Sequence, residues 1–255
     1  MSELSWDLRI ARANELSQKN SAVSEMLGFY QRLARFQKNV YQAVASAADH
    51  DVSILLRHFP AFLELIQKAG SPSLKESAKA LEQASAEERL ELLTAFWQHE
   101  GELHQLPAEY RFFAHALLQP YAEYLAERTN SSTEASPPLC PFCGSKPQLA
   151  VLRPEGDGGR RFLLCSLCGT EWLFRRLLCP NCAEENKERL PVFTAAEFDY
   201  VRVDACDTCH TYIKSIDLTK NGKAIPVVDE LATLSLNLWA QENNYQKLQP
   251  NLFGV

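Results

Sequence analysis

The chain has 255 residues, of which 46% are hydrophobic and 23% charged, the proportions of a soluble globular protein with room for two modest domains or one large one. The formal net charge of −6 gives no long-range attraction for nucleic acid or for an anionic membrane, so we expect neither as a partner. Residues 1–20 lack a basic segment followed by an apolar run, and no stretch of the chain approaches about 18 apolar residues. We therefore expect no secretory signal, no membrane insertion and a cytoplasmic location.

Residues 1–129 predict an all-helical domain. Apolar side chains recur there every three or four residues, which is the period of one helix face. The three series are Met26, Phe29, Leu33, Phe36, Val40 and Val44, then Leu90, Leu93, Phe96 and Trp97, then Leu106, Tyr110, Phe113, Leu117, Tyr121 and Leu125. We interpret them as core packing. Ser73 with Glu76, and Ser85 with Glu88, fit capping boxes and predict two helix starts.

Residues 130–138 form a polar Ser/Thr/Pro linker, and beyond it the pattern changes to short extended runs separated by turn signals. Strands are predicted at 148–153, 160–164, 192–195, 200–205 and 211–218. A helix is predicted from Val227 to about Gln241, followed by an irregular tail.

All eight cysteines lie in four Cys-x-x-Cys units, which are Cys140/Cys143, Cys165/Cys168, Cys179/Cys182 and Cys206/Cys209. Structural disulfides are not expected in a reducing compartment. A Cys-x-x-Cys turn directs two thiolates toward one point and supplies half of a tetrahedral four-sulfur site, so four turns make two closed sites. A closed site has no open coordination position, and hydrolytic metal catalysis is not expected.

The pairing of the four units follows from the predicted hairpins. An antiparallel hairpin brings its ends together, which places the first unit beside the second, and the same reasoning places the third beside the fourth. Tandem pairing is thus favoured over interleaved pairing. A tetrahedral set of four thiolates accepts zinc or iron, so we expect two mononuclear ions, Fe or Zn.

Other chemistry is less consistent with the pattern. The sequence Cys206-Asp-Thr-Cys209-His210 matches a c-type haem attachment motif, but haem would need export and would leave Cys179/Cys182 without partners, so we expect no haem. The spacings also differ from those of thioredoxin-like redox pairs and iron–sulfur clusters. Residues 138–225 carry 12 Lys/Arg and 11 Asp/Glu, so two loaded sites leave the region acidic and argue against a nucleic-acid-binding zinc ribbon.

Read with their flanks, the four units resemble one family, the formate dehydrogenase accessory proteins of the FdhE type. The matching stretches are CPFCGSKP at 140–147, LLCSLCGTEW at 163–172, Arg176 with CPNC at 179–182, CDTCHTYIK at 206–214, DELATLSLNL at 229–238 and PNLF at 250–253. The resemblance covers residues 139 to 255, and the helical first half fits the family in type only. His210 departs from the glycine that is more usual there.

The fold that this resemblance implies is an α+β multidomain chain. It has an all-α domain over 1–129, the linker over 130–138, and tandem rubredoxin-like or zinc-ribbon β modules over 139–178 and 179–225. A C-terminal helix and tail follow over 226–255.

The function that the resemblance implies is that of a non-enzymatic, cytoplasmic maturation factor. Such a protein binds the catalytic subunit of formate dehydrogenase as a chaperone-like adapter and is needed for its activity. A homo-oligomer is left open. Carried over to this chain, the metal ligands are Cys140, Cys143, Cys165 and Cys168 at site 1, and Cys179, Cys182, Cys206 and Cys209 at site 2. The alternative function is that of a rubredoxin-like electron-transfer protein holding iron.

Trp172 with its neighbours Glu171, Arg175 and Arg176 is the candidate partner-binding group. Glu171 and Trp172 belong to the stretch most distinctive of the family, and aromatic and arginine side chains often carry interface energy. The alternative interpretation is that Trp172 is buried and anchors the linker.

Overall fold

The computed structural model describes residues 3–98, 106–129, 137–156 and 158–255. Its α-helices are α1 Glu3–Lys19, α2 Ser24–Ala45, α3 Phe59–Ala69, α4 Pro72–Gln83, α5 Ala86–Gln98, α6 Ala108–Glu127, α7 Pro226–Ala232 and α8 Leu234–Glu242. Its strands are β1 Pro147–Glu155, β2 Gly158–Cys165, β3 Glu171–Leu173, β4 Val192–Thr194, β5 Val201–Cys206, β6 Thr211–Asp217 and β7 Gln246–Lys247. Short 3₁₀ helices η1 Ser21–Val23 and η2 Val52–His58 connect the first helices.

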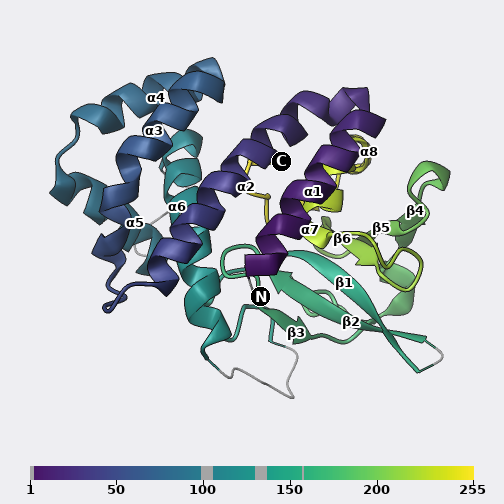
Figure 1. Cartoon of the computed structure of the whole chain (residues 1–255). Coiled ribbons are helices and arrows are strands. Elements are labelled where there is room, and N and C mark those ends of the chain that lie inside the picture. The colour runs from purple at the N-terminus through teal and green to yellow at the C-terminus, as the bar shows by residue number, and fades with distance from the viewer. Residues whose placement is uncertain (1–2, 99–105, 130–136, 157) are drawn as a thin grey trace.

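The first six helices form a group on one side of the molecule, and the sheet lies on the other (Figure 1). The three predicted apolar series fall on α2, α5 and α6, except that Leu106 precedes α6, and half of their members are buried. Helix α6 is buried continuously from Phe112 to Tyr124, so it is the central helix of this group. The all-helical prediction is confirmed for the described residues, whereas most of the predicted linker, 130–136, lies outside them.

One of the two predicted helix starts is correct. At α5, Glu88 accepts a hydrogen bond from the Ser85 backbone N–H, and the Glu88 N–H donates to the Ser85 hydroxyl, which completes the capping box. The predicted box at Ser73 is wrong. Helix α4 begins at Pro72, and Ser71 is its N-cap, since its hydroxyl accepts from the Leu74 N–H. Proline at the first helical position favours this earlier start.

The β-strands form one sheet in the order β3-β2-β1-β6-β5-β4, with β7 paired to β6. The first half is the antiparallel hairpin β1–β2 with β3 at its edge, and the second is the antiparallel pair β5–β6 with β4 at its edge. The halves join through a parallel pairing of β1 with β6, where Ala150 lies opposite Ser215 and Leu152 opposite Asp217. The predicted module boundary at 178/179 falls between the halves of this sheet.

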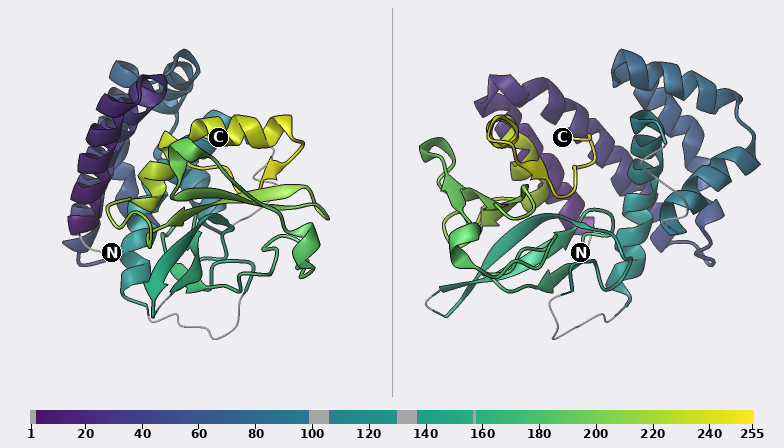
Figure 2. Two further views of the ribbon diagram at one scale, coloured as in Figure 1. Left: turned by 90° about the vertical axis from the view of Figure 1, so that its right-hand side faces the viewer. Right: turned by 180° about the vertical axis from the view of Figure 1, so that it is seen from behind.

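The predicted C-terminal helix is two helices that cover one face of the sheet (Figure 2). The break lies at Thr233, whose hydroxyl donates to the backbone carbonyls of Asp229 and Glu230. The fully buried ammonium of Lys214 donates to the Glu230 carbonyl at 2.6 Å and pairs with the Glu230 carboxylate. This cation binds the carbonyls at the end of α7, where a positive charge is favourable, and α8 begins at Leu234. The tail, predicted to be irregular, contributes the short strand β7.

Buried ion pairs fasten the N-terminal helices to each other and to the C-terminal segment. The guanidinium of Arg12 on α1 contacts both carboxylate oxygens of Asp229 on α7, at 2.6 and 3.0 Å. Arg9 pairs with Glu123 on α6 at 2.9 Å. Within the described residues, no helix combines the length and apolar character needed to cross a membrane.

Candidate metal centres

Each Cys-x-x-Cys unit is a tight turn at the end of a hairpin or strand. In three of the four turns, the N–H of the residue after the second cysteine donates to the carbonyl of the first, from Gly144 to Cys140, from Ala183 to Cys179 and from His210 to Cys206. In three cases the N–H of the first cysteine also donates to a backbone carbonyl just after the turn, from Cys140 to Ser145, from Cys165 to Thr170 and from Cys179 to Glu184. These bonds turn both thiols of a unit to one side.

Site 1 is assembled by the β1–β2 hairpin. Cys140 and Cys143 precede β1, and Cys165 ends β2 with Cys168 in the following turn. The Sγ atom of Cys143 lies 3.3 Å from that of Cys165 and 3.5 Å from that of Cys168. Cys140, Cys165 and Cys168 are buried and belong to the hydrophobic cluster that also contains the helices.

Site 2 is assembled at the same position of the second half of the sheet. The third turn precedes β4 and β5, and the fourth joins β5 to β6. The Sγ atoms of Cys179 and Cys209 are 3.7 Å apart, and those of Cys182 and Cys206 are 3.6 Å apart. Cys182 is exposed and Cys209 half-buried, so this site lies nearer to solvent than site 1.

The residue that closes each turn has a left-handed backbone conformation. At site 1 both are glycines, Gly144 with φ of 73° and Gly169 with φ of 64°. At site 2 they are Ala183 with φ of 60° and His210 with φ of 54°. The fourth turn therefore forms without the glycine that its conformation favours, at some cost in backbone strain.

Hydroxyl groups accompany three of the four turns, a feature absent from the sequence prediction. The residue two positions after the second cysteine places its hydroxyl oxygen against that cysteine's sulfur, at 3.4 Å for Ser145, 3.1 Å for Thr170 and 3.0 Å for Thr211. A hydroxyl that donates to a thiolate stabilises its charge. The repeated pattern C-x-x-C-x-S/T was the sequence signal that could have found these residues.

The thiols of each site affect one another strongly. Burial raises the pKa of the Cys165 thiol well above its usual range, and the neighbouring sulfurs add to this effect. The adjacent sulfurs of Cys140 and Cys143 raise the pKa of Cys168. At site 2, burial raises the pKa of Cys209, but hydrogen bonding led by the Thr211 hydroxyl outweighs burial and brings the pKa to about 6. Four thiolates at such distances therefore require a cation between them.

The donor sets fit a tetrahedral metal ion. All four sulfurs of each group lie within 4.8 Å of one another, and both groups are those of tandem pairing. Metal–sulfur bonds of about 2.3 Å place tetrahedral sulfurs about 3.8 Å apart, close to the observed separations. A disulfide would need about 2 Å, and all eight cysteines are free.

The four candidate partner-binding residues have different surroundings. Trp172 is only 3% exposed, and its indole N–H donates to the Pro137 carbonyl at 2.9 Å. This burial favours the alternative interpretation, in which the ring holds the segment before site 1. Glu171 pairs with Arg153, Arg175 pairs with Glu185, and Arg176 donates to the Gly159 carbonyl.

Comparison with known proteins gives the family. The family model for the FdhE central domain matches residues 139–176, and that for the FdhE C-terminal domain matches residues 177–253. The "Protein FdhE homolog" of Aquifex aeolicus is 34% identical over 209 residues, which are 81% of this chain and 72% of that protein. The chain belongs to the FdhE family.

Other FdhE relatives match more partially. The homologue of Shewanella oneidensis is 33% identical over 142 residues, covering 54% of this chain and 47% of its own length. The chain thus spans about half the length of that relative. The fold is that of the crystallised FdhE protein from Pseudomonas aeruginosa, with a TM-score of 0.79 at 24% identity, covering 100% of this chain and 97% of that one.

Proposed function

We propose that this protein is a cytoplasmic maturation factor that binds the catalytic subunit of formate dehydrogenase as a non-enzymatic adapter. Membership of the FdhE family is the observation that carries the proposal, because the family's accessory proteins serve that enzyme. The two four-cysteine groups lie along a single sheet. In this function they stabilise the surface that meets the partner.

Each four-cysteine group holds one metal ion in this proposal. The chemistry of the donors supports it, since four sulfurs at tetrahedral separations saturate one ion. Zinc would supply folding energy alone, and iron would add a one-electron couple. A saturated ion has no position for a substrate or a water molecule, which supports an adapter over a metallohydrolase.

The segment between β3 and the third cysteine turn is the proposed partner contact. Arg175, Arg176 and Leu177 are exposed in succession there, and the Leu177 side chain is 50% exposed. Arginine and apolar side chains side by side are typical of protein interfaces. Glu171 and the buried Trp172 precede this segment on β3.

Co-purification tests the adapter function. Tagged wild-type protein should capture the catalytic subunit from an anaerobic extract, and the double variant Arg175→Glu/Arg176→Glu should capture at least about tenfold less, since two contacts reverse their charge. Arg160→Glu is the matched control, because Arg160 is also an exposed arginine paired with a glutamate. Failure of metal-loaded wild type to capture the subunit rejects the adapter function.

Elemental analysis tests the metal content independently. Fully loaded protein should contain two metal ions per chain. One ion per chain, or a single four-iron cluster, contradicts the proposal of two separate sites.

Electron transfer is the second candidate function, favoured by the position of site 2. Cys182 is exposed and the Cys209 sulfur contacts the Thr211 hydroxyl, so an iron ion there would lie near the surface with a tuned thiolate shell. Native protein that contains iron and changes its visible spectrum reversibly on reduction would support this function. Native protein that contains only zinc would exclude it.

A further inference from the structure

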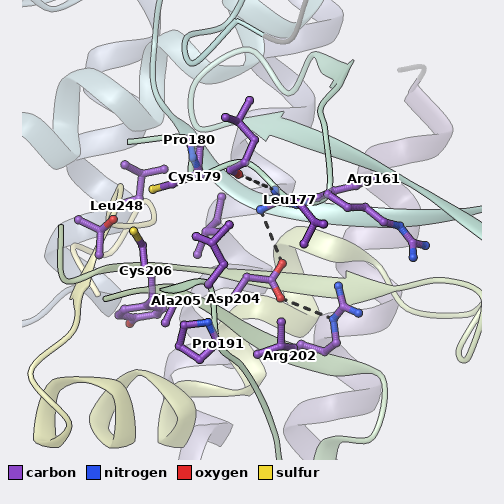
Figure 3. A pocket seen from close by; sticks show the side chains of 17 residues that line it. Arg161, Leu177, Cys179, Pro180, Pro191, Arg202, Asp204, Ala205, Cys206 and Leu248 are labelled. Atoms are coloured by element: carbon purple, nitrogen blue, oxygen red, sulfur yellow. Dashed lines mark hydrogen bonds and ion pairs between the residues drawn. The ribbon is translucent and has the colours of Figure 1, made fainter. Parts of the chain in front are cut away.

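A cavity of about 190 Å³ lies beside site 2, between the halves of the sheet (Figure 3). Residues of β2, β5 and β6 line it, and the exposed side chains of Leu177 and Val192 lie at its rim. Strand alternation directs Arg161, Arg202 and Asp204 to the sheet face opposite to α8. The cavity is large enough for a small organic molecule, because an apolar cavity of about 150 Å³ holds benzene.

Arg161 is the feature that distinguishes this cavity. Its side chain is 3% exposed, and its Nη1 atom donates to the carbonyls of Arg175 and Leu178 at 3.2 and 3.4 Å. Its Nε atom is buried without a partner, and Nη2 has only Asp204 at 3.6 Å. The Nε–Nη2 edge of a guanidinium is the edge that binds a carboxylate with two parallel hydrogen bonds. Here no group lies within hydrogen-bond distance of either atom of that edge.

The charge around Arg161 is incompletely balanced. Asp204 lies between two guanidinium groups in Figure 3, at 3.6 Å from Arg161 Nη2 and 3.6 Å from Arg202 Nε. One oxygen of Asp204 also accepts from the Ser215 hydroxyl, and the other, which faces Arg202, is buried without a hydrogen-bond partner. Arg176 adds a third guanidinium to the lining. Burial lowers the pKa of Arg161, and Asp204 offsets this only in part.

The rest of the lining is apolar. The side chains of Leu177 and Val192 are 50% and 53% exposed at the rim, and Leu178, Leu190, Pro191 and Leu248 continue inward. A ligand with an apolar body would remove these side chains from water. Asp204 disfavours a dianion near the same arginines, so the site suits a single negative charge.

We propose that this cavity binds a monocarboxylate with a short aliphatic body, its carboxylate on the unsatisfied Nε–Nη2 edge of Arg161 and beside Arg202, and its body against Leu177 and Val192. Two sources supply this chemistry, a free short-chain acid and the carboxyl terminus of a peptide that ends in an aliphatic residue. The proposal does not depend on the adapter function or on which metal site 2 holds.

Isothermal titration of the full-length, metal-loaded protein tests the proposal in two arms. The first arm compares 4-methylpentanoate with its neutral amide, and the second compares a tetrapeptide ending in leucine with its C-terminally amidated form. At least one acid should bind with a dissociation constant below about 1 mM, and its amide should bind at least about tenfold more weakly, since a charge-assisted pair of hydrogen bonds is lost. The arm that binds more tightly identifies the source.

Three variants locate the binding. Arg161→Gln and Arg202→Gln should each weaken binding of the acid about tenfold or more. Arg160→Gln, on the same strand but exposed and paired with Glu155, should leave it within about twofold. If Arg161→Gln does not fold, Arg202→Gln decides, because Arg202 is 24% exposed and tolerates replacement better.

Three results overturn the proposal. The first is that neither acid binds with a dissociation constant below about 1 mM. The second is equal binding of acid and amide, and the third is binding that both arginine variants leave unchanged. Metal analysis accompanies each titration, because Cys179 and Cys206 also line the cavity. Loss of metal in the arginine variants, with no binding by wild type, would assign the arginines to balancing the thiolates of site 2.

Discussion

The two four-cysteine groups share one ligand pattern and differ in what surrounds them. Three sulfurs of site 1 lie in the hydrophobic cluster that contains α2 and α6, and His115 of α6 contacts the Ser166 carbonyl inside its second turn at 2.8 Å. Site 2 lies outside that cluster, with Cys182 exposed. The comparison indicates that the same motif can stabilise different parts of a fold. Site 1 is part of the main core, and site 2 stabilises mainly its own half of the sheet.

Removal of one ligand at each site should give the largest difference between the two sites. Cys165→Ser should lose the metal of site 1 and destabilise the helices too, by about 5 kcal/mol or more, because structural zinc contributes on the order of 10 kcal/mol to a fold. Cys182→Ser should leave the helical unfolding transition nearly unchanged. Urea unfolding followed by circular dichroism measures both. Equal effects of the two variants on the helical transition would show that both sites are coupled to the helices to the same extent.

Alkylation mapping of the same variants reports the pairing. In Cys165→Ser, the thiols of Cys140, Cys143 and Cys168 should become reactive, while those of site 2 stay protected by their metal. Reactive site 2 thiols would contradict tandem pairing.

The next largest difference should be in the stability that is lost when an aromatic side chain beside each site is replaced by alanine. Trp172→Ala should cost about 3–5 kcal/mol, the usual range for a buried tryptophan. Trp239 on α8 is only half-buried against Phe193 in the second half, at 4.7 Å between ring centroids, and its replacement by alanine should cost about half as much. Thermal unfolding of both variants measures the difference. A smaller loss for Trp172→Ala than for Trp239→Ala would be the contrary result.

The rate of metal release should also differ between the two sites. A chelator or a metallochromic dye should remove the metal of site 2 about tenfold faster, since Cys182 is accessible without unfolding of the core, and tenfold corresponds to about 1.4 kcal/mol in barrier. Stopped-flow release traces should show two equal amplitudes. Cys182→Ser should abolish the fast one. Release in a single phase from the wild type would contradict the expected difference in metal accessibility between the sites.

The smallest expected effects concern the turns. His210→Gly should stabilise the second half by about 0.5–1 kcal/mol, because glycine relieves left-handed strain but loses more conformational entropy on folding. Gly169→Ala should destabilise site 1 by about 1 kcal/mol for the converse reason. Denaturant midpoints compare the two, with Ala183→Gly as a second test at site 2. Destabilisation by His210→Gly would mean that the ring contact with Tyr245 outweighs the strain.

The sequence predicted what depends on local patterns. Helical periods located α2, α5 and α6, and the spacing of the cysteines led to the groups that the hairpins bring together. Several features depend on residues far apart in the chain and had no local signal. The parallel pairing of β1 with β6 joins strands from different hairpins. Lys214 lies on β6 and binds the Glu230 carbonyl, close to the point where the C-terminal helix is interrupted. Trp172 likewise shows its role only through a carbonyl 35 positions earlier.

The parallel pairing of β1 with β6 has a consequence for synthesis on the ribosome. After β1 emerges, roughly 55 residues must follow before β6 begins, which takes several seconds at about 5–20 residues per second. During this interval the outer edge of β1 has open backbone donors and acceptors, and it can pair with another nascent chain. The interval between synthesis of Arg12 and synthesis of its ion-pair partner Asp229 is longer still. A metal ion bound early at site 1 would hold the first hairpin in its final shape through this delay, so metal supply during translation should govern how much of the newly made protein stays out of aggregates.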